Sequence, residues 1–269
     1  MRELSLSEIQ QENLKILKLL DSICRKENIR YTLFYGTLLG AIRHNGFIPW
    51  DDDLDIAMPR KDFERLAEYF NVHEQELLPY KWFSYETVSG YPYMIPRVCN
   101  TSFKMEMENS DACGMGTFVD IYPMDGAGNG KHIFLYRKAL FYSSMYFSKG
   151  LEKYVKTKGL IKNSIKHFAY VLSKLNTWKS IRKRLVSIAA KYSYEQSDYV
   201  ASMTWLVYGE KNIFFKASIE DLIEHKFEDS SFFIPRKYDQ MLRDFYGDYL
   251  RLPPENERKG HHNYKIFKE

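Results

Sequence analysis

The chain has 269 residues and a net charge of +4, with 45% hydrophobic and 16% aromatic residues. This length can bury a well-packed core in one large domain or two small ones. Cys24, Cys99 and Cys113 follow no CxxC or zinc-ligand spacing, which argues against a disulfide framework and a zinc site. No run approaches the roughly 20 apolar residues of a membrane-spanning helix, and the N-terminus lacks the basic and apolar regions of a signal peptide. We therefore expect a cytoplasmic protein, either free or peripheral at the inner face of a membrane.

The first part of the chain contains the most informative stretch, residues 31–60. Ser5 and Glu8 have capping-box spacing and predict a helix over residues 6–27, after which 31–35 resembles a short strand. Gly36 and Thr37 then precede a short helix. Asn45-Gly46 and Pro49 interrupt the chain before Asp51, Asp52, Asp53 and Asp55. In a strand, the three odd-numbered carboxylates would share one face while Asp52 points away.

The remaining elements are predicted from apolar periodicity. Residues 62–70 favour a helix, and 82–88, 94–99 and 102–107 favour strands. In GTFVDIYPMDG, residues 116–126, a strand would place Asp120 on the same face as Phe118 and Tyr122. Residues 131–192 are typical of helices, 227–234 of an extended piece and 235–245 of a helix. Residues 252–269 are expected to be irregular, with His261 and His262 exposed.

The aspartates require an explanation because two carboxylates about 4 Å apart repel by roughly 4 kcal/mol at an effective dielectric of 20. A divalent ion would relieve this repulsion, and Mg²⁺ (or Mn²⁺) prefers carboxylate and phosphate oxygens. Gly36 and Thr37 at a helix start could hold a phosphate. Together these features predict metal-assisted phosphoryl or nucleotidyl transfer. A solvated acidic loop is the alternative.

The longest motifs are GTLLGAIRHNGFIPWDDDLDIAMPR, FVDIYPMD and IPRKYDQMLRDFYGDYLRLPP. They resemble the LicD family of phosphocholine transferases, which belongs to the nucleotidyltransferase fold superfamily and is related to fukutin. The resemblance covers residues 8–125 and 225–262. It implies an α+β (α/β) fold, in which helices flank a mixed sheet and a basic helical insertion is present. The expected divisions are a catalytic core over 1–130, a basic helical segment over 131–195 and a C-terminal part over 196–269.

The resemblance also implies site residues and substrates. Asp51, Asp53, Asp55 and Asp120 would hold the metal, and Asp53, Asp55 and Asp120 would be catalytic. The reaction would transfer phosphocholine from CDP-choline to a sugar hydroxyl of a lipid-linked glycan, a teichoic acid or lipopolysaccharide precursor. Because the cluster repels itself, we expect Asp53→Asn or Asp120→Asn to abolish transfer without unfolding the protein.

Binding roles for other residues follow from their chemistry and stay open to purely structural alternatives. Gly36, Thr37, Arg43, His44 and Arg97 are candidates for binding the nucleotide pyrophosphate. Aromatic faces bind quaternary ammonium groups, and the candidates for choline are Trp50, Tyr91, Tyr93, Trp205 and Tyr208. Rival functions are transfer of ribitol phosphate, glycerol phosphate or a nucleotide by the same site, and a non-catalytic glycan- or membrane-binding protein.

The positive charge is concentrated between Lys149 and Lys191, where twelve Lys or Arg residues accompany the single acid Glu152. An anionic membrane surface would suit residues 149–191, with an apolar stripe dipping into the lipid and basic side chains meeting phosphates. The stripe expected in this role consists of Trp178, Ile181, Leu185 and Ile188, with Arg182, Lys183 and Arg184 beside it. A solvated basic face on a packed helical subdomain is the equal alternative. No nucleic-acid-binding motif accompanies the charge, so no nucleic acid partner is expected.

Overall fold

The fold is seen in a computed structural model that describes residues 1–108, 111–130, 133–151, 153–206, 209–260 and 264–268. It divides into two compact units. The core unit comprises Met1–Pro123 and Ser218–Glu269, and the helical unit comprises Met124–Ala217. The domain boundaries expected at residues 130 and 195 stay predictions, because compactness alone does not show which parts fold independently.

The main sheet of the core unit places the two aspartate-bearing segments next to each other. Its strand order is β2-β3-β7-β5-β4, and β2–β3, β5–β7 and β4–β5 are antiparallel pairs. The backbone N–H of Asp120 donates a 2.8 Å hydrogen bond to the carbonyl of Leu54, immediately before β3. The strands are β2 (Thr32–Leu33), β3 (Asp55–Pro59), β4 (Tyr80–Phe83), β5 (Arg97–Asn100) and β7 (Thr117–Gly128).

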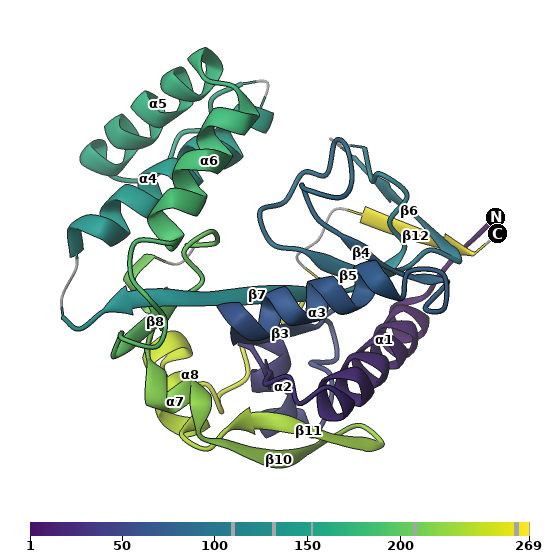
Figure 1. Ribbon diagram of the computed structural model, residues 1–269. Coiled ribbons are helices and arrows are strands. Elements are labelled where there is room, and N and C mark those ends of the chain that lie inside the picture. Colours follow the sequence, from purple (N-terminus) through teal and green to yellow (C-terminus); the bar gives the residue numbers. More distant parts are fainter. Residues whose placement is uncertain (109–110, 131–132, 152, 207–208, 261–263, 269) are drawn as a thin grey trace. The chain divides into compact units, whose positions relative to one another are not determined.

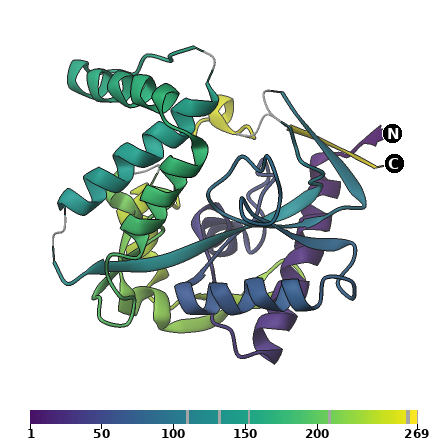
Figure 2. The same cartoon turned by 45° about the horizontal axis from the view of Figure 1, so that its top comes forward.

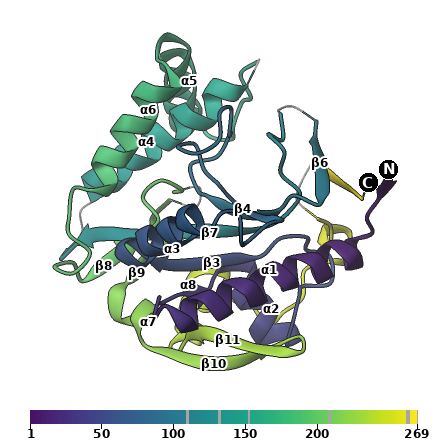
Figure 3. The same cartoon turned by 45° about the vertical axis from the view of Figure 1, so that its right-hand side comes forward.

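Helices pack around this sheet. The predicted capping box is present, since the Ser5 hydroxyl accepts from the Glu8 N–H and the Glu8 carboxylate accepts from the Ser5 N–H. Figures 1 and 3 both place α2 between β3 and the β10–β11 hairpin. The helices are α1 (Leu6–Lys26), α2 (Tyr35–His44), α3 (Arg60–Val72), α7 (Lys216–Glu220), α8 (Tyr238–Tyr246) and the 3₁₀ turn η2 (Glu255–Glu257).

Two short antiparallel assemblies complete the core unit. The extended piece predicted over 227–234 is a hairpin of β10 (Leu222–Phe227) and β11 (Ser230–Pro235). Pro235 therefore ends a strand, and the helix predicted from it begins three residues later. The expectation that 252–269 is irregular is wrong, because β12 (Tyr264–Lys268) pairs between β1 (Arg2–Glu3) and β6 (Phe103–Met107). Figure 2 shows the first and last strands side by side.

The helical unit confirms the prediction of helices over residues 131–192. Figure 1 shows α4, α5 and α6 side by side, and the end of β7 pairs with β8. Three of the four residues proposed to enter a membrane pack inward instead: Ile181 and Leu185 are fully buried, and Ile188 belongs to the unit's core, while Trp178 is 36% exposed. The elements are α4 (Ile133–Gly150), α5 (Leu160–Leu175), α6 (Trp178–Ala189), β8 (Tyr199–Ala201), η1 (Gly209–Asn212) and β9 (Ile213–Phe215).

These elements confirm the α+β class with helices around a mixed sheet. Among the residues that the structure describes, none of the helices combines the length and apolar character needed to span a membrane.

Candidate active site

Asp51, Asp52 and Asp53 lie in a loop that leads into β3, and not on a strand as predicted. Side chains of α1 hold the backbone of this loop. The Gln10 amide donates to the carbonyl of Asp51 at 2.8 Å, and the Asn13 amide donates to the carbonyl of Asp52 at 2.9 Å. These carbonyls therefore bond to a helix and not to a neighbouring strand, which removes the alternation on which the prediction depended.

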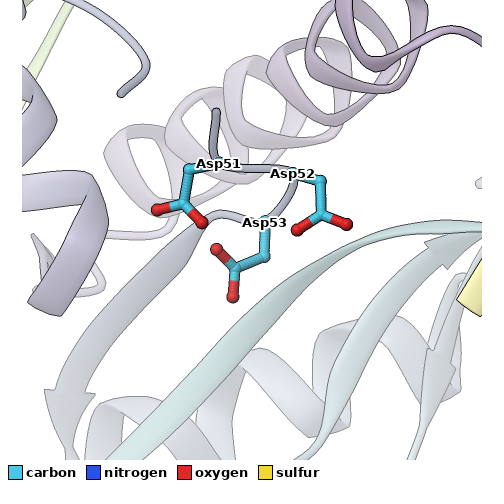
Figure 4. Close-up of side chains that lie close together, drawn as sticks. All are labelled: Asp51, Asp52 and Asp53. Atoms are coloured by element: carbon cyan, nitrogen blue, oxygen red, sulfur yellow. The ribbon is translucent and has the colours of Figure 1, made fainter. Parts of the chain in front are cut away.

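The loop conformation brings Asp52 back to the site. Figure 4 shows the side chains of Asp51, Asp52 and Asp53 gathered around one small space. Each offers a carboxylate oxygen within 4.8 Å of the others. The expectation that Asp52 points away from its neighbours is wrong, because it assumed the period of two of a strand.

A second group of carboxylates shares Asp53 with the first. Asp53, Asp55 and Asp120 also place oxygens within 4.8 Å of one another, with Asp55 at the start of β3 and Asp120 on β7. The predicted convergence of two strands on one acidic site is therefore present. The two overlapping groups form a continuous set of five carboxylates, which we call the aspartate site.

Asp55 is buried within the aspartate site, and its surroundings disfavour the ionised carboxylate. It is only 5% exposed, and its Oδ1 atom is buried with no hydrogen-bond partner among the described residues. Burial raises the pKa of Asp55 well above its ordinary value, and the charges of Asp53, Asp120 and Asp51 raise it further, while a hydrogen bond from Tyr122 opposes the shift. Among the described residues, the Tyr122 hydrogen bond thus offsets only part of the cost of ionising Asp55.

Asp120 has a different environment because it faces Arg97 across β5 and β7. The two residues are direct cross-strand partners, and the guanidinium donates from Nε to Oδ1 at 2.6 Å and from Nη2 to Oδ2 at 3.3 Å. The rings of Phe118 and Tyr93 cover the guanidinium, whose carbon lies 3.8 Å and 4.0 Å from their centroids. Arg97, a candidate for pyrophosphate, is thus buried and bound to Asp120; its predicted contact with a substrate stays untested.

Gly36 and Thr37 lie in the first turn of α2, close to the aspartates. A Cβ atom at Gly36 would stand 3.0 Å from Oδ2 of Asp51, so the glycine permits this carboxylate to approach the helix start. The buried Thr37 hydroxyl accepts a 2.7 Å hydrogen bond from the N–H of Asp55. Thr37 therefore holds β3 in place through its hydroxyl, in addition to the phosphate-binding role predicted for this turn.

Arg43, His44 and Trp50 lie together at the other end of α2. Nε of Arg43 donates to Nε2 of His44 at 2.9 Å, and Nη1 donates to the carbonyl of Tyr249 at 3.0 Å. Burial and the charge of Arg43 lower the pKa of His44, so its ring is neutral near pH 7. The Trp50 ring, half-buried, lies 6.2 Å from the His44 ring.

The remaining choline candidates differ in accessibility. Tyr91 is fully buried with its hydroxyl bound to the carbonyl of Ile95, so its ring cannot face a ligand. Tyr93 already covers Arg97, and Trp205 belongs to the helical unit, where it packs on Phe147. Tyr208, like His261 and His262, lies outside the described residues. Trp50, which directly precedes the aspartates, remains the best candidate.

Sequence reasoning missed several residues that position the site. Asn13 is fully buried, and besides holding the Asp52 carbonyl it accepts from the N–H of Phe118 on β7 at 2.8 Å. The sequence did contain a signal for Asn13, because it is a polar residue at a position that falls within the apolar stripe of Ile9, Ile16 and Leu20. The hydroxyl of Tyr264 on β12 also donates to the Asp52 carbonyl, at 3.4 Å. No pattern near residue 264 indicated this contact.

The aspartate site suits a divalent cation by two criteria. Its donors are all carboxylate oxygens, the ligands that Mg²⁺ and Mn²⁺ favour. The buried Oδ1 of Asp55 has no hydrogen-bond partner in the part of the chain that the structure describes, and a cation would supply one. Arg97 forms an ion pair with Asp120 of this site at 2.6 Å.

Similarity to known proteins agrees with this geometry. The profile of the "LicD/FKTN/FKRP, nucleotidyltransferase domain" family matches residues 28–149. The lipopolysaccharide cholinephosphotransferase LicD of Haemophilus influenzae is 31% identical to the chain over 97% of both proteins. Uncharacterized proteins of Rickettsia typhi and Rickettsia prowazekii are 38% and 42% identical over 30% and 24% of the chain, which corresponds to 24% and 21% of their own lengths.

A nucleotidyltransferase-type sheet with an acidic site at its centre, together with similarity over nearly the whole chain, defines the class as a phosphotransferase. The chain belongs to the LicD/FKTN/FKRP nucleotidyltransferase-domain family. These similarities support an enzyme over the rival interpretation as a non-catalytic binding protein.

Proposed function

We propose that this protein transfers phosphocholine from CDP-choline to a sugar hydroxyl of a cell-surface glycan precursor. The observation that carries the proposal is the similarity to a lipopolysaccharide cholinephosphotransferase over 97% of both chains. The family resemblance keeps a teichoic acid precursor as the alternative acceptor. In the transfer, the acceptor oxygen forms a bond to the choline-bearing phosphorus, the bond from phosphorus to CMP breaks, and the hydroxyl proton leaves.

The aspartate site would hold one or more Mg²⁺ or Mn²⁺ ions, with Asp51, Asp53, Asp55 and Asp120 as ligands. The geometry adds Asp52 to these candidates. A bound divalent cation would neutralise the negative charge that develops on the departing phosphate. Asp53 is the ligand that the proposal makes most essential, because it belongs to both carboxylate groups.

The surrounding residues would orient the substrate. The first turn of α2 presents backbone N–H groups beside Asp51, a place where a pyrophosphate oxygen can be received. Arg43 would add positive charge, and the Trp50 ring would provide an aromatic face for the trimethylammonium group. A carboxylate of the set would accept the proton of the acceptor hydroxyl.

Incubation with choline-labelled CDP-choline, Mg²⁺ and a lipid-linked glycan tests the proposal. Release of CMP with label on the glycan is the expected result, and Asp53→Asn should abolish both. CDP-ribitol and CDP-glycerol test the rival that the same site moves another phospho-alcohol. Preferential turnover of either, with CDP-choline inert, would overturn the choline assignment and leave the phosphotransferase class intact.

A further inference from the structure

Helix α5 presents large apolar side chains to solvent. Six of these residues form a set that we call the apolar face of α5: Leu160, Ile161, Ile165, Phe168, Val171 and Leu175. Leu160 is 89% exposed, Leu175 78% and Ile161 77%, and the other three are between 43% and 57% exposed. At about 100° per residue these six positions cover roughly 140° of the helix circumference. They therefore form one continuous stripe.

The side of α5 that packs inward is made of small residues. Ala169 and Ser173 are the buried residues of this helix, and α5 packs along α4. The end of the contact is fixed by Lys149, whose ammonium donates to the Ser173 carbonyl, and by Lys174, which donates to the carbonyls of Lys149 and Leu151. An ordinary amphipathic helix turns its leucines and isoleucines to the core, so the orientation of α5 is reversed.

The neighbouring helix shows that this reversal is specific to α5. On α6 the apolar stripe is buried, with Ile181 and Leu185 fully inaccessible. The same unit thus packs one apolar stripe and exposes the other. A contiguous exposed stripe of this size marks a contact surface in a soluble protein.

Positive charge surrounds the apolar face of α5. Lys153, Lys156 and Lys158 lie exposed in the loop before the helix, and Lys162 and Lys174 lie exposed on it. No acidic residue occurs between residues 153 and 194. On the helix, Lys162 and Lys174 border the stripe on opposite sides, at about 60° and 40° from its edges. An apolar stripe with lysines on both borders is the pattern of a helix that lies in a bilayer interface.

We propose that α5 lies in the interface of an anionic membrane, with its apolar face in the acyl boundary and the flanking lysines against lipid phosphates. Charge complementarity selects this occupant. A second copy of the chain would bring two sets of lysines together with no acidic residue to offset them. The proposal is independent of the substrate assignment, since it concerns only where the helical unit binds.

Co-sedimentation of the full-length protein with vesicles tests this. Vesicles of phosphatidylglycerol and phosphatidylethanolamine should bind the protein, phosphatidylcholine vesicles should bind it weakly, and salt should reduce binding to the anionic vesicles. Ile165→Ser/Phe168→Ser should lower the partition coefficient at least tenfold by removing apolar contact. Lys158→Gln/Lys162→Gln should lower it roughly 25-fold, at about fivefold per lysine.

Matched variants elsewhere on the chain provide controls. Val72→Ser removes a side chain that is 65% exposed on α3, and Lys226→Gln/Lys237→Gln removes two exposed lysines from the core unit. Both should bind vesicles like the unchanged protein. Equal losses in control and α5 variants, or no binding to anionic vesicles at low salt, would overturn the proposal. So would a stable dimer in light scattering that Ile165→Ser/Phe168→Ser converts to monomer, since the face would then be an interface between copies.

Discussion

The hydroxyl of Thr37 accepts a 2.7 Å hydrogen bond from the backbone N–H of Asp55 and so ties α2 to the first residue of β3. Both residues are buried. Thr37→Val keeps the shape of the side chain but leaves that N–H without a partner, which should reduce the free energy of unfolding by about 1–3 kcal/mol. Urea unfolding measures the loss, and Thr37→Ser, which keeps the hydroxyl, should lose much less. Equal stability of the Val variant and the unchanged protein would contradict the role given to this bond.

Asn13 links the aspartate loop to β7, because it donates to Asp52 and accepts from Phe118. Asn13→Leu should leave the Phe118 N–H unpaired and remove one hydrogen bond from the Asp52 carbonyl, lower stability by about 1–3 kcal/mol and displace the loop carboxylates. We expect turnover at saturating donor to require a higher Mg²⁺ concentration, a change that a general loss of stability would not produce. Gln11→Leu, on the exposed side of α1, is the matched control. An unchanged Mg²⁺ requirement in Asn13→Leu would refute the positioning role.

Asp53 and Asp120 should respond differently to the same substitution. Asp53→Asn removes one charge from a repelling group, so the metal-free protein should be as stable as before or slightly more stable. Asp120→Asn leaves the buried Arg97 guanidinium without its carboxylate and should cost about 3–5 kcal/mol. This revises the sequence-based expectation that both variants keep the fold intact.

Chemical unfolding in the presence of a chelator separates the two variants. Arg97→Met/Asp120→Leu, which removes both members of the pair, should be more stable than Asp120→Asn alone. We assign a stabilising role to the Arg97–Asp120 ion pair and expect Asp53 to be repelled by its neighbours. If Asp53→Asn proved less stable than Asp120→Asn, this assignment would be wrong.

Asp55 should make the metal-free protein less stable as pH rises. Its folded-state pKa lies well above the value of about 3.9 for an unfolded aspartate, because it is buried beside Asp53, Asp120 and Asp51. The stability that protonated Asp55 gives the folded protein is therefore fully present below about pH 4. This part of the free energy of unfolding is lost as pH increases towards the raised pKa. Unfolding measured with a chelator at several pH values should show this decline, and Asp55→Asn should remove that part of it. A pH dependence identical in the two proteins would rule out a raised pKa at Asp55.

His44 should titrate below the usual range of histidines, because it is partly buried and receives a hydrogen bond from the charged Arg43. Arg43→Gln should raise the pKa of His44 towards about 6.5. NMR titration of the His44 ring resonances, in the unchanged protein and in Arg43→Gln, measures this directly. A His44 pKa that is insensitive to Arg43→Gln would show that burial alone sets it.

Local signals in the sequence predicted much of this arrangement. The capping box at Ser5 located the start of α1 to the residue, and the alternation around Asp120 placed its side chain on the face where Arg97 meets it. Both features depend on residues within a few positions of each other. The presence of a carboxylate site between β3 and β7 followed from the same local patterns.

The parts that escaped prediction depend on contacts between distant residues. Asp51, Asp52 and Asp53 adopt a loop because Gln10 and Asn13, about 40 positions earlier, bind their carbonyls. The alternation of Asp residues is equally compatible with a strand until those partners are known. Likewise, the apolar periodicity of residues 160–175 does not show whether the stripe of α5 faces the core or solvent.

The position of β12 links segments that are far apart along the chain. β12 is the central strand of its small sheet, between β1 and β6, and its Tyr264 contacts the carbonyl of Asp52. Deletion of residues 264–268 would therefore separate β1 from β6 and remove the Tyr264 hydrogen bond from the aspartate loop. The conformation of that loop thus depends in part on a residue that lies 212 positions away in the sequence.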